Sequence, residues 1–327
     1  MAKNLNLAAA KKAKNDEFYT QLTDIEQELA HYQDQLWGKV IFCNCDDPTW
    51  SNFWRYFHLN FTHLGLKRLI STHYDPEKPT YKLEYIGGDD ENLEAGVRTE
   101  LKQNGDFRSP ECVKLLKDCD IVVTNPPFSL FREYINQLMH YDKKFIVIGN
   151  MNAITYKEIF PLIKNNQMWV GTNVKGGSRR GNSLLFPVPD DFESKSLVMF
   201  DGKRCAQVSA WWFTNVDLAK RHEPLTLFRR YADDPGKYPK YDNYDAINVN
   251  KTVDIPEDYF GPMGVPISFL DKYCPEQFEI LGTTESEGKG FSNGLFKIGV
   301  GTVTQPLVNG QRVYKRLFIQ RKICPSG

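Results

Sequence analysis

Residues 120–128 read DIVVTNPPF, a short apolar run that leads directly into two prolines. The four residues before Asn125 are β-branched, which predicts a buried strand over 120–124. Proline stops both sheet and helix, so the strand must end in a stiff turn. Packing alone does not require so stiff a turn. The tetrad at 125–128 is therefore either a simple strand terminator or part of a functional site.

Similar apolar runs on both sides predict further strands, separated by helical patterns. Strands are expected at 39–43, 67–72, 120–124 and 144–149, and helices at 22–36, 53–61, 130–139 and 156–165. This alternation is typical of an α/β fold with a mainly parallel, doubly wound sheet covered by helices on both faces. Ligands bind at the carboxyl ends of the strands in such sheets. Unusual polar turns follow or adjoin these ends at 45–50, 74–76, 105–107 and 125–128.

Two regions depart from this alternation. The polar stretch 76–104 predicts a loop with one strand at 81–86. From about residue 168 the chain becomes a series of short β-like segments, interrupted by the loop KGGSRRGNS at 175–183. The segments near 184–188 and 208–214 could complete the first sheet or lie beyond a domain boundary.

The composition is that of an ordinary globular protein, with 41% hydrophobic and 25% charged residues in 327. No apolar run approaches the ~18 residues that span a bilayer, and the N-terminus lacks the apolar core of a signal peptide. We therefore expect a cytoplasmic protein without a membrane partner. Seven cysteines without a CxxC pair indicate reduced thiols, and we expect no structural metal.

The charge distribution carries only a weak signal. The formal net charge is zero, which by itself argues against a nucleic-acid partner. Basic residues nevertheless occur in pairs in the second half of the chain, at 179–180, 203–204, 220–221 and 229–230. Such pairs are more often solvated surface than binding sites.

The tetrad at 125–128 has the chemistry to hold an aromatic amino group. Such an amine is a poor nucleophile because its lone pair is delocalised into the ring, and two acceptors aimed at its hydrogens would favour rehybridisation. The side-chain oxygen of Asn125 and the carbonyl of Pro126 can supply these acceptors, Pro127 stiffens the turn, and Phe128 offers a flat face to the ring. Catalysis would then depend on positioning and preset dipoles, without a strong general base.

The motif and its surroundings resemble the EcoRI-type adenine-specific DNA methyltransferases, which use S-adenosylmethionine. The similar segments are NDEFYTQ, FCNCDDPTWSNF, NGDFRS, DIVVTNPPFSLF, YPKYDNYDAINVNKT and MGVPISFL. The likeness extends from about residue 15 to 281 and weakens over 171–210 and the last part of the chain. It implies a class I, Rossmann-like methyltransferase fold with a C-terminal target-recognition region.

The resemblance implies a role for each matching residue. The donor's methionine part would pack against Phe18, Tyr19 and Thr20; the first cofactor loop would contain Asp46, Asp47 and Pro48; Asp75 would accept the ribose hydroxyls; Asp106 and Phe107 would hold the adenine ring; and Asn125, Pro126, Pro127 and Phe128 would hold the target amine. The sequence CDDPTWSNF replaces the usual glycine-rich first loop. Alternatively, the Asp-Asp-Pro could cap the helix at 53–61, and Asp75 and Asp106 could be turn residues.

An amino group inside duplex DNA cannot reach a buried methyl donor, so the adenine must be flipped out. Phe128 would stack on it, and Trp211, Trp212 or Phe213 could form a second aromatic wall, although aromatic residues in a strand are more often core. The loop at 175–183 could follow the phosphate backbone, with Arg179 or Arg180 reaching guanine edges. It could equally be a solvated hairpin.

The sequence thus predicts an N6-adenine DNA methyltransferase that acts on double-stranded DNA. A cognate restriction endonuclease of the same system is a candidate partner that need not contact this chain, and the sequence leaves its existence open. We expect a mobile N-terminus over 1–14, a cofactor-binding and catalytic domain over 15–170, and the remaining strands with the target-recognition region over 171–327. The alternatives are an amino methyltransferase acting on RNA or on protein glutamine, and a DNA-binding relative without catalysis.

Overall fold

The computed structural model describes residues 20–173, 178–188, 196–285, 290–297 and 303–323. The segment 1–14, with Phe18 and Tyr19, lies outside these ranges. The chain forms two units, Met1–Met151 with Val170–Val216 and Asn152–Trp169 with Asp217–Gly327. Over the described ranges, no helix has the length and apolar character needed to cross a membrane. No group of His, Cys, Asp or Glu side chains in those ranges could hold a metal ion.

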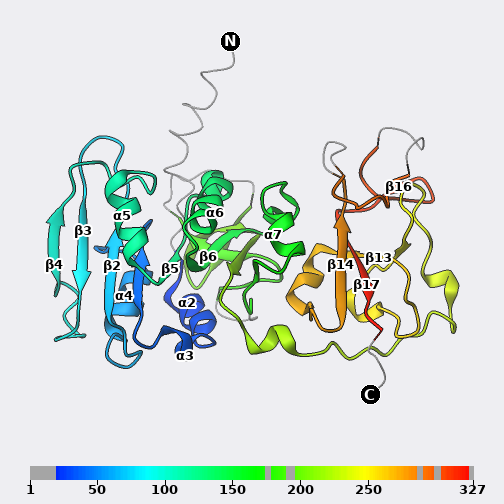
Figure 1. Cartoon of the computed structure of the whole chain (residues 1–327), viewed down its shortest axis with the longest axis horizontal. Coiled ribbons are helices and arrows are strands. Elements are labelled where there is room, and N and C mark those ends of the chain that lie inside the picture. Colours follow the sequence, from blue (N-terminus) through cyan, green and yellow to red (C-terminus); the bar gives the residue numbers. More distant parts are fainter. Residues whose placement is uncertain (1–19, 174–177, 189–195, 286–289, 298–302, 324–327) are drawn as a thin grey trace, which may run out of the picture. The chain divides into compact units, whose positions relative to one another are not determined.

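The first unit contains an eight-stranded mixed sheet with the order β4-β3-β2-β1-β5-β6-β11-β7 (Figure 1). Its strands are β1 (Val40–Cys43), β2 (Arg68–Thr72), β3 (Tyr81–Tyr85), β4 (Val97–Glu100), β5 (Ile121–Thr124), β6 (Lys144–Asn150), β7 (Trp169–Val170) and β11 (Ala210–Thr214). The central strands β2, β1, β5 and β6 are parallel. β3, β4 and β11 pair antiparallel with their neighbours. The predicted α/β fold is confirmed, and its parallel part is the centre of the sheet.

Helices cover both faces of this sheet. They are α2 (Leu22–Leu29), α3 (Gln33–Leu36), α4 (Asn52–Leu59), α5 (Pro110–Asp118) and α6 (Phe131–His140). Trp212 of β11 packs edge-on against Phe53 of α4, with ring centroids 5.9 Å apart. The next residue, Phe213, packs against Phe131 of α6 at 5.2 Å. Successive strand residues point to opposite faces, so α4 and α6 lie on opposite faces of the sheet.

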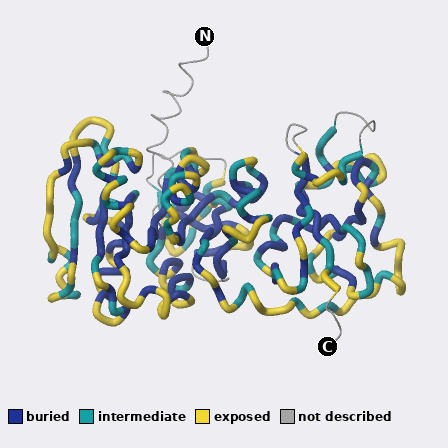
Figure 2. The backbone as a smooth tube through the Cα atoms, viewed as in Figure 1, coloured by how far each residue is buried: buried dark blue, intermediate teal, exposed yellow. Residues whose placement is uncertain are grey.

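Two predictions about local structure need correction. The single helix expected over 22–36 is interrupted, because bonds from His31 N–H to the Glu28 carbonyl and from Tyr32 N–H to the Leu29 carbonyl tighten its end into a turn. The expected loop at 76–104 contains β4 as well as β3. All four residues of β4 are exposed, so this edge strand has no alternating apolar pattern to reveal it (Figure 2).

The later strands of the first unit divide between two sheets. β11 completes the large sheet, as the sequence allowed. β8 (Leu184–Pro187) instead forms a separate antiparallel sheet with β10 (Lys203–Val208) and β9 (Leu197–Phe200). Helix α2, near the start of the chain, is hydrogen-bonded to the segment that follows β7. The buried Glu28 carboxylate accepts hydrogen bonds from the Thr172 amide at 2.7 Å, the Thr172 hydroxyl at 2.6 Å and the Asn173 amide at 3.0 Å.

The second unit contains a four-stranded sheet with the order β12-β13-β17-β14. Its elements are α7 (Phe160–Lys164), β12 (Ile247–Asn248), β13 (Met263–Pro266), β14 (Phe278–Thr283), β17 (Arg316–Arg321) and the hairpin of β15 (Leu307–Val308) with β16 (Gln311–Arg312). Tyr241, Tyr244 and Phe318 form its aromatic core. The segment YPKYDNYDAINVNKT at 238–252 therefore contributes two tyrosines to the core of this unit.

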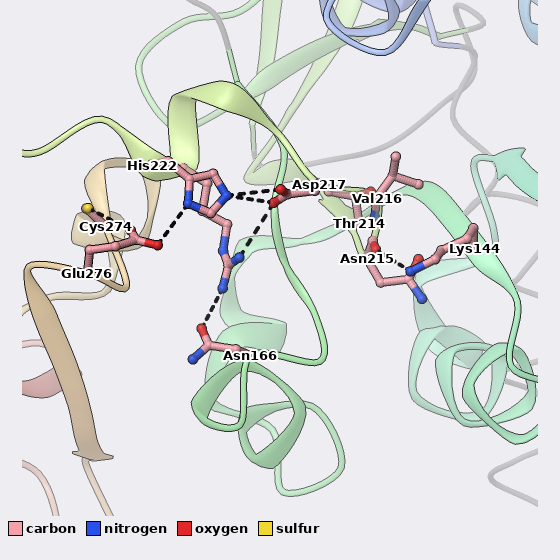
Figure 3. A network of polar contacts seen from close by, with 10 residues as sticks. Lys144, Asn166, Thr214, Asn215, Val216, Asp217, His222, Cys274 and Glu276 are labelled. Carbon is pink, nitrogen blue, oxygen red and sulfur yellow. Dashed lines mark hydrogen bonds and ion pairs between the residues drawn. The ribbon is translucent and has the colours of Figure 1, made fainter. Parts of the chain in front are cut away.

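A polar network holds the segment around His222 in the second unit (Figure 3). Nδ1 of His222 lies 2.9 Å from the Glu276 carboxylate, and Nε2 lies 3.0 Å from both oxygens of Asp217. Hydrogen bonds to Glu276 and then to Asp217 raise the pKa of His222. Arg221 donates to the Asn166 side-chain oxygen at 2.6 Å. When the imidazole is protonated, its two N–H groups can donate to both carboxylates at once.

Candidate active site

The polar turns singled out in the sequence meet at one edge of the large sheet. β1, β2 and β5 are parallel neighbours, and Asn44, His73 and Asn125 follow their carboxyl ends directly. Asn125 is 6% exposed, Pro126 is buried, and Pro127 and Phe128 are partly buried. The Pro127 carbonyl accepts the Leu130 amide at 3.0 Å, which begins the turn into α6. The tetrad thus continues β5 at the edge where a ligand is expected.

Asp46 connects the loop after β1 to the strand that leads into the tetrad. Its Oδ1 accepts a hydrogen bond from the Ser51 hydroxyl at 2.8 Å, and its Oδ2 accepts one from the Thr124 hydroxyl. The Cys45 amide also donates to the Thr124 hydroxyl, at 3.3 Å. Ser51 in turn caps α4 by accepting the Phe53 amide at 3.1 Å. The N-cap of α4 is therefore Ser51, and Asp46 accepts a hydrogen bond from the hydroxyl of this residue.

Asp47 lies in the same loop, followed by the buried Pro48. Its Oδ1 accepts hydrogen bonds from the Thr49 hydroxyl at 2.8 Å and the Tyr81 hydroxyl at 3.1 Å, and its Oδ2 lies 3.6 Å from His73 Nε2. Burial, followed by the Asp47 charge, raises the pKa of Tyr81 to about 12. Burial also lowers the pKa of His73, although the Asp47 carboxylate opposes it. The Tyr81 phenol therefore keeps its proton at neutral pH and donates it to the Asp47 side chain.

The segments that carry Asp75 and Asp106 lie side by side. The Asp75 amide donates to the Asn104 carbonyl at 2.9 Å, and the Asp75 carboxylate accepts the Glu77 amide at 2.9 Å. Gly105 has a φ of +73°, and a Cβ there would lie 1.9 Å from the His73 carbonyl oxygen. This approach requires glycine in the sequence NGDF. It brings Asp75, which is expected to bind the ribose of the cofactor, close to the segment with Asp106 and Phe107, which are expected to bind its adenine.

Asp106 is held by the arginine that follows Phe107. Its Oδ1 accepts the Arg108 Nε–H at 2.8 Å and the Arg108 amide at 2.9 Å, and its Oδ2 accepts from Nη2 at 2.6 Å. Burial acts to raise the pKa of Asp106, but the hydrogen bonds from Arg108 and its charge outweigh burial and lower it. Arg108 also donates to Glu133 of α6 at 3.2 Å. Asp106 is thus a fixed carboxylate at neutral pH.

Phe107 and Asn44 both contact the same buried tyrosine, Tyr134. The Phe107 ring is 5% exposed and packs edge-on against Tyr134, with centroids 5.1 Å apart. The Tyr134 hydroxyl donates to the side-chain oxygen of Asn44. Burial raises the pKa of Tyr134 well above its ordinary value, so the hydroxyl keeps its proton. Tyr134 therefore fixes the orientation of the Asn44 amide.

Several buried polar atoms at this edge lack a partner among the described residues. They are the Asn44 Nδ2, the hydroxyls of Thr20 and Thr80, and the His73 Nδ1. Buried polar groups are normally hydrogen-bonded, and each such exception needs an explanation. The donors and acceptors left over here fit a polar ligand such as a nucleoside with an amino-acid tail. The edge therefore fits the cofactor that the sequence implies.

The loop at 175–183, for which the sequence left open both a DNA contact and a solvated hairpin, is only partly described, since 174–177 lie outside the described residues. Arg179 is 6% exposed and donates to the Asn173 side chain and the Ala210 carbonyl, both at 3.2 Å. Arg180 is exposed, and its guanidinium lies 4.4 Å from the centre of the Phe200 ring. Residues 180 and 183 pair as a tight hairpin around Gly181. This arrangement favours the solvated hairpin, with Arg179 as a buried support.

Trp211 and Trp212 of β11 are each 2% exposed. Trp212 packs against Phe53, as described above, and the Trp211 main chain pairs with Gly149 of β6. This burial favours the alternative that both are core residues.

Sequence reasoning missed several residues of the site. Thr124, Ser51 and Asn44 were not singled out, although each is a polar residue next to a residue that was. Tyr134 lies in the helix predicted at 130–139, and nothing in its spacing distinguishes it from the apolar residues of that helix. The useful signal for the first three is a polar side chain at the end of a buried strand or at the start of a helix.

Comparison with known proteins shows the family of this chain. The family model described as "Adenine-specific methyltransferase EcoRI" matches residues 6–322. The chain belongs to this family of adenine-specific methyltransferases. It is 45% identical to the Type II methyltransferase M.EcoRI of Escherichia coli, with 98% of both chains covered. It is 40% identical to the Type II methyltransferase M.MpnI of Mycoplasma pneumoniae, with 96% of this chain and 97% of the relative covered.

A third relative supports the same assignment. The Type II methyltransferase M.MgeORF184P of Mycoplasma genitalium is 39% identical, with 96% of this chain and 98% of the relative covered. No solved structure matches the chain. Membership of the EcoRI-type family confirms the resemblance seen in the motifs, and it covers both units of the chain.

Proposed function

We propose that this adenine-specific methyltransferase transfers a methyl group from S-adenosylmethionine to N6 of an adenine flipped out of a short duplex DNA site. Family membership and the named Type II methyltransferase relatives support the reaction class. One observation carries the proposal at the level of residues. Asn125, Pro126 and Phe128 continue β5 at the sheet edge where Asp46, Asp75 and Asp106 also gather.

The methyl donor would lie across the ends of β1 and β2, as in a class I, Rossmann-like methyltransferase. Asp106 and Phe107 would hold its adenine, Asp75 its ribose, and Thr20, with Phe18 and Tyr19 before it, its methionine part. The Asn44 Nδ2, with no acceptor among the described residues, suits the donor's carboxylate. When bound, the donor supplies an electrophilic methyl group on a sulfonium centre.

The two carboxylates of the first loop would act indirectly. Asp46 is engaged by Ser51 and Thr124, and Asp47 is engaged by Thr49 and Tyr81. We infer that Asp46 positions the loop and the tetrad, and that Asp47 with Pro48 shapes the wall of the cofactor site. This differs from direct cofactor contact, which the family motif implied for both.

The target amine would be held by the tetrad. The side-chain oxygen of Asn125 and the carbonyl of Pro126 would accept its two hydrogens, and Phe128 would stack on the base. These contacts favour the rehybridised nitrogen in the transition state, so they lower the barrier without a general base. The excess proton can leave to solvent after the methyl group has been transferred.

The remaining assignments are coarser. We propose that the second unit contributes to recognition of the DNA site, because the first unit already contains the whole sheet edge described above. The relatives' Type II designation suggests a restriction-modification system with a cognate endonuclease, which need not contact this chain.

The deciding experiment uses purified protein, unmethylated genomic DNA and isotopically labelled S-adenosylmethionine, with modified bases mapped by single-molecule sequencing. Label on adenine within one short motif is the expected result, and heat-denatured protein is the control. Label on RNA or on protein glutamine, with none on DNA, would contradict the proposal. Binding of the donor without any transfer would support the inactive DNA-binding alternative.

A further inference from the structure

The basic doublets of the second unit are paired with acidic residues. Lys220 lies 2.7 Å from the Asp271 carboxylate, and Arg230 lies 3.7 Å from Glu257. Arg229 similarly lies 3.8 Å from a carboxylate. Such pairs offset the positive charge that a polyanion would meet. The doublets that stand out in the sequence are therefore poor candidates for contacts with DNA.

A different pair of cations, Lys315 and Arg316, forms no ion pair with any described carboxylate. The Lys315 ammonium is partly buried, and among the described residues it donates to the Thr155 hydroxyl alone, at 3.0 Å. Arg316 is 6% exposed, and its Nη1 donates to the backbone carbonyls of Tyr314 and Lys315, at 2.8 and 3.4 Å. Two adjacent positive charges are thus held in place without a counter-ion in the part of the chain that the structure describes.

Partly buried charges of like sign without a counter-ion are unfavourable unless an anion binds. Burial lowers the pKa of Lys315, as expected for an ammonium that has lost water without gaining a carboxylate. An ammonium has three donor hydrogens, and the Thr155 hydroxyl accepts one of them. Donors of the Lys315 ammonium therefore remain for a ligand oxygen, and an anionic ligand would also offset the charge of Arg316.

The preceding residue, Tyr314, is an exposed aromatic residue whose partner, Asn152, lies in the same short 3-10 helix as Thr155. Tyr314 is 55% exposed, and its hydroxyl donates to the Asn152 side-chain oxygen at 2.6 Å. The ring is therefore fixed at its polar end while much of it faces solvent. A point charge beside a fixed, exposed ring suits an anion with a neighbouring apolar or sugar surface, as in a nucleic-acid backbone.

We propose that Lys315 binds a phosphate of duplex DNA, with Tyr314 against the adjacent sugar and Arg316 strengthening the local positive potential. This inference rests on the proposed function, since the ligand is the DNA substrate. The contact is independent of base sequence, because it is made to the backbone. It would position the second unit on the duplex and leave base recognition to other residues.

The test is the salt dependence of DNA binding. The full-length protein and its variants are titrated into a fluorescently labelled duplex over a range of monovalent salt concentrations, and anisotropy gives the affinity. Lys315→Met should reduce the slope of log K against log salt by about 0.9, the value of one phosphate contact. Extrapolated from 1 M salt, this corresponds to about eightfold weaker binding near 0.1 M.

Two further variants make the result specific. Lys315→Arg should keep the wild-type slope, because the charge is retained. Lys322→Met should also keep it, since Lys322 is an exposed lysine of the same unit that likewise donates to one neutral oxygen, the Pro275 carbonyl at 2.6 Å. Thermal unfolding followed by circular dichroism checks that all three variants fold as the wild type does.

Each outcome separates this inference from the proposed function. A wild-type slope in Lys315→Met overturns the inference, as does a loss of affinity with an unaltered slope, which would indicate a structural role only. If Lys315→Met does not fold, a loss of slope in Lys315→Gln is required, and its absence also overturns the inference. A wild-type protein that binds no duplex DNA would overturn the proposed function itself.

Discussion

The Thr124 hydroxyl donates a hydrogen bond to the Asp46 carboxylate and accepts one from the Cys45 amide. Thr124 is the last residue of β5, and Asn125 follows it directly. The same carboxylate accepts a bond from Ser51, the cap of α4. One buried carboxylate therefore fixes the loop after β1, the start of α4 and the strand end that carries the tetrad. We infer that Asp46 and Thr124 position Asn125 without touching the amine.

Thr124→Val should impair catalysis more than binding. Valine has the shape of threonine but leaves an acceptor oxygen of Asp46 unsatisfied, which should cost about 1.5–3 kcal/mol in the free energy of unfolding. Small displacement of Asn125 should lower kcat by about tenfold to a hundredfold at saturating donor and DNA. Thr124→Ser keeps the hydroxyl and should restore most of kcat. Steady-state kinetics and urea unfolding measure both effects, and an unchanged kcat in Thr124→Val would refute the positioning role.

Asn125→Ala should abolish transfer while the donor still binds. The substitution removes one of the two acceptors for the amine, so the rate should fall by at least about 10²–10³-fold. Calorimetry with S-adenosylmethionine should give a Kd within about twofold of wild type, because the proposed cofactor contacts lie at other strand ends. If this variant instead fails to fold, the tetrad is a structural turn, which is the alternative that the sequence left open.

The Asp106–Arg108 pair should set the acid limit of donor binding. Arg108 lowers the pKa of Asp106, so the carboxylate remains an acceptor as pH falls and is lost only when pH falls through this depressed value. Arg108→Met should raise that pKa, so binding of the donor should weaken at a higher pH than in wild type. Calorimetric Kd values between about pH 4 and about pH 7 measure this.

Asp106→Asn is the matched control for this pH dependence. The amide does not titrate, so donor binding should be weaker but without the acid limb that belongs to Asp106. An identical acid limb in Asp106→Asn would assign the titration to another group.

The sequence predicted the central part of the fold because each element there has a clear period. The segments at 39–43, 67–72, 120–124 and 144–149 each contain a short apolar run, and they correspond to β1, β2, β5 and β6. β4 escaped prediction because its residues are all exposed, and the end of α2 escaped because Tyr32 continues the apolar spacing beyond the last helical turn. Edge strands and helix ends depend on tertiary context rather than on pattern.

The candidate site was predicted by residue type but not by contact. The family motif pointed to Asp46 and Asp106, and both lie at the expected edge. That Asp46 binds two hydroxyls, and that Arg108 grips Asp106, depends on side-chain geometry that spacing does not encode. Arg179 shows the converse: its sequence context suggests a free cation, whereas its side chain is buried against Asn173.

Glu28→Ala should strongly destabilise the first unit. The Glu28 carboxylate is 1% exposed and accepts hydrogen bonds from Thr172, Asn173 and the Tyr32 hydroxyl. Its removal leaves several buried donors unsatisfied, so the free energy of unfolding should fall by about 3–5 kcal/mol. Glu26→Ala, an exposed position on the same helix, should change it by less than about 0.5 kcal/mol. Urea unfolding compares the two, and equal effects would exclude a bracing role for Glu28.

His222→Gln should make the second unit less stable only on the acid side of neutrality. Both ring nitrogens of His222 face carboxylates, and these contacts raise its pKa in the folded protein. A raised pKa means that the added stability is fully present below the unfolded value of about 6.5 and disappears as pH rises through the folded value. The difference in Tm between wild type and His222→Gln should therefore be largest below about pH 6 and shrink toward about pH 8.

Glu276→Gln provides the graded control for this effect. It removes the contact that contributes most to the raised pKa of His222. The added stability should then disappear over a lower pH range than in wild type, because the folded pKa moves back toward its ordinary value. Thermal unfolding monitored by circular dichroism between about pH 5 and about pH 9 gives each curve. A Tm difference for His222→Gln that stays constant with pH would show that His222 acts by packing, and that the two carboxylates do not hold it as an imidazolium.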